Sequence, residues 1–376
     1  MLRRALLLSS GVVVLLLAGC LPSVYDEPYP VRSVELPADD AAHDAPFEWW
    51  YWVGHLEAED GRRLAFQLTF FEAFGPPEVR ILGLPSHWWF EKELVAHAAK
   101  TDLDAGEHAM AQRGFALSEG EASRERLDVS VNDWRAVRHE DGVSHRLTFA
   151  VGGTAFDLVL TPTKPASLHG DPPGIQSMGP GGVSYYVSHT RMEVTGSVAP
   201  DCLFPEFCGS EPVHGQAWFD HQWGDFRIDR LGGWDWFALQ LDDGAEVMLY
   251  LIRDMGGAYV AAEGSYVTRE GRTLGLSRED FTLTPTGATW TSADTGAVYP
   301  AGWRVEVPAH DVDVTVAPLL ADQEMDTRAS TGIVYWEGAV AVRGDRPGVG
   351  FVELTNYDVR PFEPGRSGSE EQAQQR

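Results

Sequence analysis

Two neighbouring segments near the middle of the chain carry the residue types that acid–base chemistry on an apolar molecule requires. They are Ala217–Gly224, with the sequence AWFDHQWG, and Trp234-Asp235-Trp236. Histidine titrates near neutral pH, an adjacent carboxylate sets its tautomer, and aromatic faces bury apolar ligands and stabilise cations. We therefore predict a pocket for a hydrophobic molecule, with Asp220, His221 and Asp235 as acid–base groups. The alternative is a packed seam in which Asp220 caps a turn and His221 bonds the backbone.

A further carboxylate, Glu48, precedes Trp49 and Trp50. If Glu48 is buried against these rings, its pKa rises and it can hold a proton, whereas at a solvent-facing strand start it has no such role. Arg191 is expected to form an ion pair in a barrel interior or at the seam. Candidate partners are Glu337 and Glu353.

No metal or cofactor is predicted. Asp220, His221 and Asp225 could offer ligands, but only one His is present there, and metal sites generally need three or four ligands. The chain contains no phosphate loop, dinucleotide fingerprint, zinc-protease motif or nucleophile elbow. Redox-cofactor and serine-hydrolase mechanisms therefore have no motif behind them.

The N-terminus is a predicted targeting segment. Arg3 and Arg4 precede the apolar stretch Ala5–Ala18, which is shorter than the roughly 20 residues that span a bilayer. The run Leu17-Ala18-Gly19-Cys20 resembles the lipobox of bacterial lipoproteins, which implies cleavage before Cys20 and a diacylglyceryl anchor on its sulfur. Leu21, in place of Asp, resembles an outer-membrane sorting signal. We expect an outer-membrane lipoprotein, facing the periplasm or exported. An uncleaved anchor and a fully secreted protein are the alternatives.

Charge and cysteine content restrict the partners further. The formal net charge is −27, which argues against nucleic acid and anionic membrane surfaces as direct partners. Apart from Cys20, only Cys202 and Cys208 remain. An exported protein meets an oxidising compartment, so this pair is expected to form a disulfide. The rival, a two-Cys metal site, lacks a further thiol or a His-x-His sequence.

The hydrophobic pattern predicts antiparallel β-structure. Phe47–Leu56 and Leu64–Phe71 surround an Asp-Gly turn, and the second segment alternates apolar residues at period two, as in a hairpin. Short strands with Gly or Pro turns continue to the end of the chain, so we predict an all-β fold. The stretch 86–98 fits a strand or a helix. The Pro- and Gly-rich segment Thr161–Gly182 is expected to be a lid or a surface excursion.

The two halves resemble a diverged repeat. Trp50-x-Trp52 precedes Asp60-Gly61, and Trp234-x-Trp236 precedes Asp243-Gly244, with three apolar residues at equal offsets after each Gly. We therefore predict two antiparallel β-barrels in tandem. The predicted segments are a signal peptide (1–19), a solvated tether (20–45), an N-terminal barrel (46–226), a C-terminal barrel (227–362) and a disordered tail (363–376).

A set of motifs over roughly residues 46–360 resembles the lipocalin-like AttH and carotenoid 1,2-hydratase superfamily. The motifs are Glu48-Trp49-Trp50-Tyr51, Gly54-His55-Leu56, Ser184-Tyr185-Tyr186, Thr190-Arg191, Gly215 through Gly224, Trp234-Asp235-Trp236 and Tyr335-Trp336-Glu337-Gly338. The resemblance implies two tandem lipocalin-like β-barrels. Some members hydrate carotenoid end groups, fungal relatives hydrate prenylated phenolics or guide cyclisations, and many bacterial members are secreted or lipid-anchored.

The resemblance also implies roles for residues. The His-x-Trp unit implicated in catalysis corresponds to His221 and Trp223, and the Tyr of a Tyr-x-Asp pair corresponds to Tyr250, with Ile252 in place of the Asp and Asp254 two residues on. With Asp220 and Asp235, these complete the predicted catalytic set. The predicted substrate-binding residues are Trp50, Tyr186, Trp218, Trp234 and Trp236.

The sequence thus predicts a lipid-anchored protein that binds a hydrophobic, isoprenoid-like molecule at the inter-domain seam. If the protein is an enzyme, the resemblance implies a hydro-lyase that adds water to an isolated C=C bond. A non-catalytic carrier of lipid or pigment in the cell envelope is the alternative. A structural envelope lipoprotein, the third class, would fill the seam with its own side chains.

Overall fold

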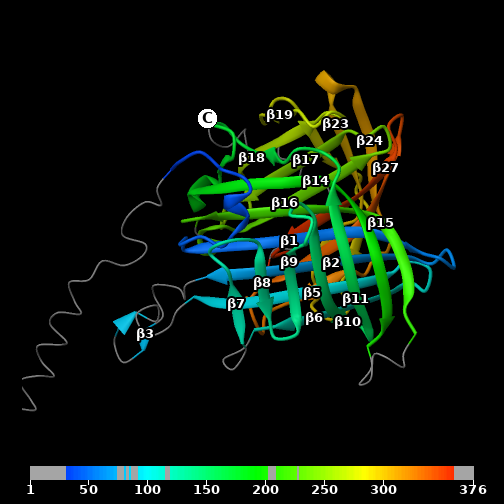
Figure 1. Ribbon diagram of the computed structural model, residues 1–376. Helices are drawn as coiled ribbons and strands as arrows, with labels where there is room; N and C mark the ends of the chain where they lie inside the picture. Colours follow the sequence, from blue (N-terminus) through cyan, green and yellow to red (C-terminus); the bar gives the residue numbers. More distant parts are fainter. Residues whose placement is uncertain are drawn as a thin grey trace, which may run out of the picture.

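The computed structural model describes residues 31–73, 80–81, 84–85, 92–114, 119–201, 209–226 and 228–359. Almost all of the regular structure is antiparallel strand, arranged as two large curled sheets that each form a half-barrel (Figure 1). The prediction of an all-β, tandem lipocalin-like fold is therefore confirmed. Cys20, Cys202, Cys208 and the tail from 363 lie outside the described residues, so the structure does not test the anchor, the disulfide or the tail.

The N-terminal sheet has the strand order β6-β5-β2-β1-β15-β14-β11-β10-β9-β8-β7, with β12 and β13 also paired to β14. Its strands are β1 (Phe47–Ala58), β2 (Arg63–Ala73), β5 (Glu93–Asp102), β6 (Glu107–Arg113), β7 (Gly120–Ala122), β8 (Asp128–Val131), β9 (Trp134–Arg138), β10 (His145–Val151), β11 (Thr154–Pro162), β12 (Ser167–Leu168), β13 (Ile175–Ser177), β14 (Val183–Pro200) and β15 (Glu211–Gly224). The short strands β3 (Arg80–Ile81) and β4 (Leu84–Pro85) pair with each other.

The C-terminal sheet has the order β19-β18-β17-β16-β27-β26-β24-β23-β20, with β25 paired to β26. Its strands are β16 (Gly233–Leu241), β17 (Glu246–Arg253), β18 (Tyr259–Val267), β19 (Thr273–Leu276), β20 (Thr282–Pro285), β23 (Trp303–Val307), β24 (Val312–Pro318), β25 (Glu324–Asp326), β26 (Val334–Gly344) and β27 (Gly348–Thr355). A separate hairpin joins β21 (Thr289–Thr291) to β22 (Val298–Pro300), and the 3-10 turns are η1 (Ala38–Asp40), η3 (Gly179–Gly181), η5 (Ile228–Arg230) and η6 (Pro308–His310). Among the described residues, no helix has the length and apolar character needed to cross a membrane.

Both sheets follow one topology. In each, four strands form a meander, and the last strand of the domain returns to pair with the first, β15 with β1 and β27 with β16. Both Trp motifs lie in the first hairpin of their sheet but one residue out of phase: Trp50 and Trp52 face the interior of their own half-barrel, whereas Trp234 and Trp236 face the space between the sheets. The repeat that the sequence pattern predicted is therefore present in the strand order.

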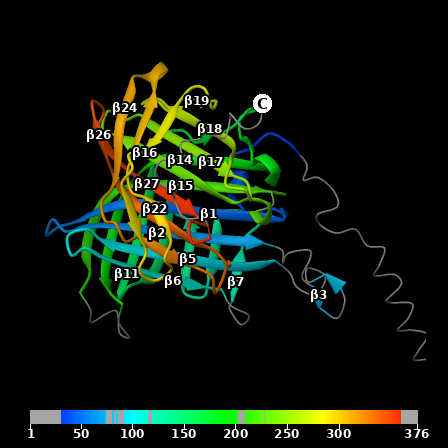
Figure 2. The ribbon, with the colours of Figure 1, turned by 180° about the vertical axis from the view of Figure 1, so that it is seen from behind.

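Period-two alternation divides the molecule into three apolar layers. On β1, Trp50 and Trp52 point into the half-barrel of their own sheet, whereas Trp49 and Tyr51 point toward the other sheet. Side chains fill both half-barrel interiors, and a third cluster lies between the sheets. Figure 2 shows the two sheets from behind, with β1 and β2 below β16 and β17. The central strands are apolar on both faces because both faces are covered.

Of the two ambiguous segments, the described end of one matches one of its alternatives, and the other segment matches neither of its alternatives. The described end of 86–98 is strand, because β5 begins at Glu93. The segment Thr161–Gly182 is neither a free lid nor a surface excursion. It pairs with β14 through β12 and β13, and it reaches the C-terminal sheet, where His169 Nδ1 lies 2.9 Å from Ser265 Oγ. This segment therefore straps the two sheets together.

The solvated tether predicted for 20–45 is wrong for its last residues. From Asp39 to Ala45 all residues except Asp44 are buried, and Ala45 is inaccessible to solvent. The composition of this segment resembled a linker because its acidic residues have no apolar period, but two arginines compensate their charge. Arg138 binds Asp40, and Arg32 binds Asp39.

Candidate functional site

The central motif on β15 is divided between two sites. Successive strand residues point to opposite faces, so Asp220 and Gln222 face the other sheet while His221 and Trp223 face the interior of the N-terminal half-barrel. The acid–base pair of Asp220 with His221 is therefore wrong: the two side chains share a backbone segment but not a site. Each must be described with the residues that surround it.

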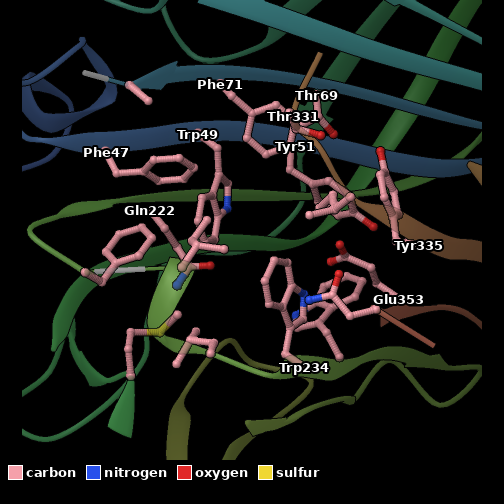
Figure 3. A pocket seen from close by; sticks show the side chains of 18 of the residues that line it. Phe47, Trp49, Tyr51, Thr69, Phe71, Gln222, Trp234, Thr331, Tyr335 and Glu353 are labelled. Carbon is pink, nitrogen blue, oxygen red and sulfur yellow. The ribbon is translucent and has the colours of Figure 1, made fainter. Parts of the chain in front are cut away.

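A cavity of about 600 Å³ lies between the two sheets. Its walls come from β1, β2 and β15 of the N-terminal sheet and from β16, β17 and β27 of the C-terminal sheet. Figure 3 shows Phe47, Trp49 and Phe71 gathered at one side, with Tyr335 and Glu353 at the other. The cavity thus has an aromatic part and a part with carboxyl and hydroxyl groups, which suits a largely apolar ligand with one reactive or polar position.

Asp220 is the first buried carboxyl group of the cavity wall. Tyr186 Oη donates to Asp220 Oδ2 at 2.6 Å, and Trp218 Nε1 donates to Oδ1 at 2.6 Å. Ser188 Oγ also donates to Oδ1. Burial raises the pKa of Asp220 to about 7, although these three donors act to lower it. One acceptor position on Oδ2 remains, since a carboxylate has about four in all.

Glu353 and Glu337 form a second acidic group on the neighbouring strands β27 and β26, where they lie directly opposite each other. Burial raises the pKa of Glu353 to about 7, with the negative charge of Asp220 adding to the effect. Burial, and then the proximity of Glu353, raise the pKa of Glu337. Tyr51 Oη donates to Glu337 Oε1 at 2.6 Å across the interface between the sheets. This group therefore holds protons near neutral pH.

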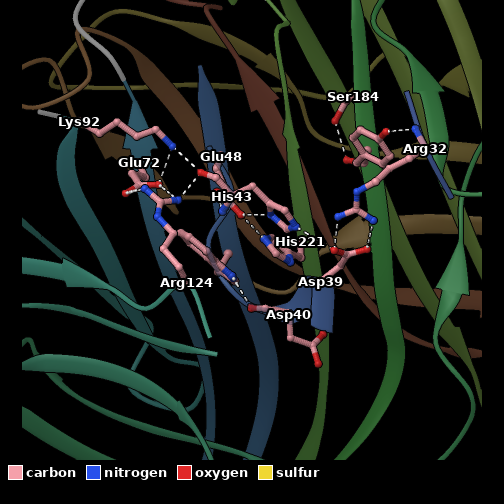
Figure 4. A network of polar contacts seen from close by, with 12 residues as sticks. Arg32, Asp39, Asp40, His43, Glu48, Glu72, Lys92, Arg124, Ser184 and His221 are labelled. Carbon is pink, nitrogen blue, oxygen red and sulfur yellow. Dashed lines mark hydrogen bonds and ion pairs between the residues drawn. The ribbon is translucent and has the colours of Figure 1, made fainter. Parts of the chain in front are cut away.

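His221 belongs instead to a buried cluster beneath the N-terminal segment, which we call the histidine cluster: His43, Glu48 and His221 (Figure 4). Glu48 Oε1 lies 2.7 Å from His221 Nε2 and 2.7 Å from His43 Nδ1, and Oε2 accepts the backbone N–H of His43 at 2.7 Å. All three side chains are buried. The two imidazoles therefore act as donors to one carboxylate.

Glu48 is buried, as one alternative required, but its pKa moves in the opposite direction from the one expected. Burial acts to raise the pKa of Glu48, yet the hydrogen bonds and charges of His221 and His43 outweigh it, and the pKa falls below its usual value. Glu48 is thus an ionised anchor and not a proton donor. The sequence could not indicate this, because His43 lies in the segment predicted to be a tether.

Aromatic rings close the histidine cluster. Trp223 stacks on His43 with ring centroids 4.0 Å apart, and Tyr185 stacks on the other side of Trp223 at 4.9 Å. Trp50 stacks on His221 at 4.9 Å. Trp50 and Trp223 are inaccessible to solvent and do not line the cavity. Their predicted roles in substrate binding and catalysis therefore have no support from their positions.

The remaining predicted residues divide in the same way. Tyr186, Trp234, Trp236 and Tyr250 line the cavity, and Trp218 lies behind it, holding Asp220. Asp235 points to the opposite face of β16, where Tyr259, Tyr357 and Arg253 bind it.

Arg191 and Asp254 both have partners other than the predicted ones. Arg191 binds Glu246 at 2.6 Å, not Glu337 or Glu353. Asp254, considered as a substitute for the missing Asp beside Tyr250, accepts the backbone N–H groups of Gly256 and Ala258 and thereby shapes a turn.

The cavity residues that the sequence analysis missed are Tyr51, Gln222, Tyr335 and the carboxyl role of Glu353. Strand alternation could have found two of them. Gln222 is in phase with Asp220 on β15 and so shares its face, whereas Tyr51 is out of phase with Trp50 on β1 and so points to the opposite face from Trp50. Tyr335 and Glu353 needed the contact between the sheets, which no local pattern encodes.

Comparison with known proteins gives a consistent picture of the whole chain. A family model described as AttH-like matches residues 27–357. The crystal structure of a candidate AttH protein from Nitrosomonas europaea is 33% identical, covers 87% of this chain and 98% of its own, and superposes with a TM-score of 0.74. Kievitone hydratase from Nectria haematococca is 16% identical, covers 86% and 94%, and has a TM-score of 0.65, which shows a shared fold. No curated protein sequence matches the chain significantly.

Proposed function

Starting from the fact that the chain belongs to the AttH-like family, we propose that it binds a hydrophobic, isoprenoid-like molecule in the cavity between the sheets and adds water to an isolated C=C bond of that molecule. We also propose that the protein is anchored at Cys20 in the cell envelope. The observation that supports the catalytic part is the combination of an aromatic cavity with carboxyl groups whose pKa values are raised to about 7, Asp220 and Glu353.

The first step of the proposed reaction is protonation of the double bond. A carboxylic acid with a pKa near the working pH is an efficient donor, and Glu353 meets this requirement at the cavity wall. The proton forms a C–H bond at one alkene carbon and leaves a carbocation at the other. The faces of Trp234 and Trp236 line the same space, and such faces stabilise a desolvated cation by about 0.5–2 kcal/mol each.

The second step is capture of the cation by water. Asp220 is the better base of the two, because three donors stabilise its carboxylate and one acceptor position on Oδ2 is left for a water O–H. The water oxygen forms the new C–O bond and its proton passes to Asp220. The sum is addition of H and OH across the double bond, with one proton leaving Glu353 and one arriving at Asp220.

A carrier function is the second candidate, favoured by the apolar character of most of the cavity wall. Phe47, Phe71, Phe226, Ile228 and Leu231 contribute to this wall without any acid–base capacity. A carrier needs this lining and no proton transfer. The kievitone hydratase neighbour carries the name of a hydratase, but at 16% identity it supports the fold alone.

The test follows water into the bound molecule. Apolar molecules that co-purify with the protein are identified by mass spectrometry, and these molecules, with geranylgeraniol as a defined probe, are incubated with the protein in ¹⁸O-labelled water. We expect a product heavier by one labelled water. Glu353→Gln and Asp220→Asn should each lower the rate by roughly 10²–10⁴, the usual contribution of one acid–base group.

Glu263→Gln is the matched control, because the pKa of Glu263 is also raised by burial but its side chain does not line the cavity. We expect this variant to keep the wild-type rate. If wild type and every variant bind the probe but wild type incorporates no label, hydration is rejected and the carrier function remains. Equal losses in Glu263→Gln and Glu353→Gln would reject the assigned role of Glu353.

A further inference from the structure

The cavity reaches the protein surface at an end where large apolar side chains are exposed. Met255 and Val359 both line the cavity and are 57% and 69% exposed. Val183 and Val260 are exposed by 39% and 44% near the same end. Of the eight large apolar residues that are exposed in the described part of the chain, these four form a group that we call the apolar rim.

Contacts between their elements hold the apolar rim together. η3 packs against β18 so closely that a Cβ on Gly179 would lie 3.5 Å from Cγ2 of Val260. Val183 begins β14 directly after this turn. Met255 occupies the turn between β17 and β18, and a Cβ on Gly232 would lie 3.2 Å from its backbone nitrogen. The rim is therefore one surface built from three neighbouring turns.

The N-terminal segment enters the fold at this same end. The backbone N–H of Arg32 donates to the hydroxyl of Tyr185. Val34 packs against the same buried cluster as Ile175 on β13, the strand that pairs with Val183–Tyr185. Val31 and Leu36 in this segment are also exposed, by 66% and 39%. Figures 1 and 2 both show the blue segment from residue 31 on the side where β14 begins.

Chain length limits how far this end can be from an anchor at Cys20. Val31 lies eleven positions after Cys20. A fully extended chain spans at most about 3.6 Å per residue, so the reach is about 40 Å. This is comparable to the diameter of one domain. An acyl group on Cys20 would therefore keep Val31, at the end of the sheets that carries the apolar rim, within about 40 Å of the bilayer.

We propose that the apolar rim docks on the surface of the lipid bilayer that holds the anchor, and that the ligand passes from the bilayer directly into the cavity. This rests on the proposed function, because it requires an apolar ligand and a lipid at Cys20. A direct route avoids exposing the ligand to water, which costs about 25 cal/mol per Å² of apolar surface. The net charge of −27 repels anionic lipid, so the surface that fits is zwitterionic.

The test places a reporter in the rim of the full lipidated chain. Met255→Cys and Val143→Cys are labelled with the fluorophore NBD, and the proteins are reconstituted in phosphatidylcholine vesicles that contain doxyl-labelled lipid. Val143 is the matched control, since it is an apolar residue of similar exposure, 54%, that does not line the cavity. We expect strong quenching at position 255 and little at position 143. Equal quenching at the two positions, or none at either, would overturn the proposal.

A second measurement follows the ligand and separates this proposal from the proposed function. The fluorescent polyene cis-parinaric acid is placed in the vesicles and its uptake by the protein is timed. The double variant Val183→Asp/Val260→Asp changes two exposed residues that do not line the cavity, so it should slow uptake at least tenfold while its affinity in detergent solution stays unchanged, and Val143→Asp should alter neither. Normal uptake by the double variant would overturn bilayer docking alone. Absence of cis-parinaric acid binding in wild type would reject the ligand-binding function itself.

Discussion

The cavity and the histidine cluster lie back to back on the same strand, yet they place buried carboxyl groups in opposite states. In the histidine cluster, two imidazoles and a backbone N–H satisfy Glu48, and the pKa of Glu48 is lowered. In the cavity, Glu353 and Asp220 border space rather than cationic partners, and their pKa values rise to about 7. Burial is common to both regions, so the partners decide which carboxyl group can donate a proton.

This difference assigns separate tasks to two halves of one sequence motif. Residues 221 and 223 fix the segment that ends at Ala45 onto the N-terminal sheet, through Glu48, His43 and stacked rings. Residues 220 and 222 face the cavity. A motif that concentrates Asp, His and Trp is therefore half structural and half functional. The division is tested by variants in the histidine cluster, which should change stability, and by variants in the cavity, which should change ligand binding.

The largest effect is expected in the histidine cluster. Glu48→Ala leaves two buried imidazoles without their acceptor, and removing one partner of a buried pair costs about 3–5 kcal/mol. The free energy of unfolding is measured by urea denaturation. Because the pKa of Glu48 is lowered in the folded state, its stabilisation is present above the unfolded pKa and is lost as the pH falls through the folded pKa. The variant should therefore lose stability at neutral pH and lose less on acidification.

Glu57→Ala provides the control for this measurement, since Glu57 is on the same strand but exposed. Its effect should stay within about 0.5 kcal/mol. If Glu48→Ala were as stable as Glu57→Ala, the histidine cluster would not be the structural half of the motif.

A smaller effect of opposite sign is expected in the cavity. The pKa of Glu353 rises from 4.5 to about 7 on folding, so the unfolded chain loses its proton first and stability falls as the pH rises from 4.5 to about 7. The raised pKa of Asp220 contributes a slope of the same sign, so Glu353→Gln should make the decline shallower without abolishing it, and should raise stability at neutral pH by no more than about 3 kcal/mol, at about 1.4 kcal/mol per pKa unit. Thermal unfolding between pH 4 and pH 8 measures it.

Glu93, an exposed carboxyl group that also lines the cavity, is the matched position for that experiment. Glu93→Gln should leave the pH profile of stability unchanged. A wild-type profile without any decline between pH 4.5 and pH 7 would show that Glu353 ionises normally and would remove it as a proton donor.

The sequence predicted the fold well because local patterns carried it. Alternation over 64–71, the Asp-Gly turns and the recurring Trp-x-Trp motif all arise from strand geometry, and the strand order confirmed two related sheets. The segment 39–45 was wrongly predicted to be solvated, because the burial of its acidic residues depends on two arginines. Arg138 is distant in the chain, and Arg32 lies in a segment without an apolar pattern.

The candidate site was predicted only in part, for a physical reason. Residue types at 220–236 predicted a pocket at the seam, and the cavity between the sheets is lined by Asp220, Tyr186, Trp234, Trp236 and Tyr250. Residues that are neighbours in the sequence were then predicted to act together in one site. On a strand, however, neighbouring residues point to opposite faces. Glu353 and Glu337 were predicted to pair with Arg191, but in the structure they lie opposite each other, and Glu337 accepts a hydrogen bond from Tyr51 across the interface between the sheets. The sequence could not show this, because β26 and β27 approach β1 only through tertiary packing.

Binding of an apolar fluorophore by two Trp variants tests the central claim, that the space between the sheets is the ligand site. Trp234 lines the cavity, whereas Trp223 is buried in the stack on His43. Trp234→Ala should weaken binding of cis-parinaric acid by about 2 kcal/mol or more, roughly thirtyfold, as the loss of an aromatic anchor does. Folded Trp223→Ala, or Trp223→Phe where the cavity left by Ala prevents folding, should bind as tightly as wild type. Unchanged affinity in Trp234→Ala together with weakened binding in the Trp223 variant would contradict the account and move the ligand into the N-terminal half-barrel.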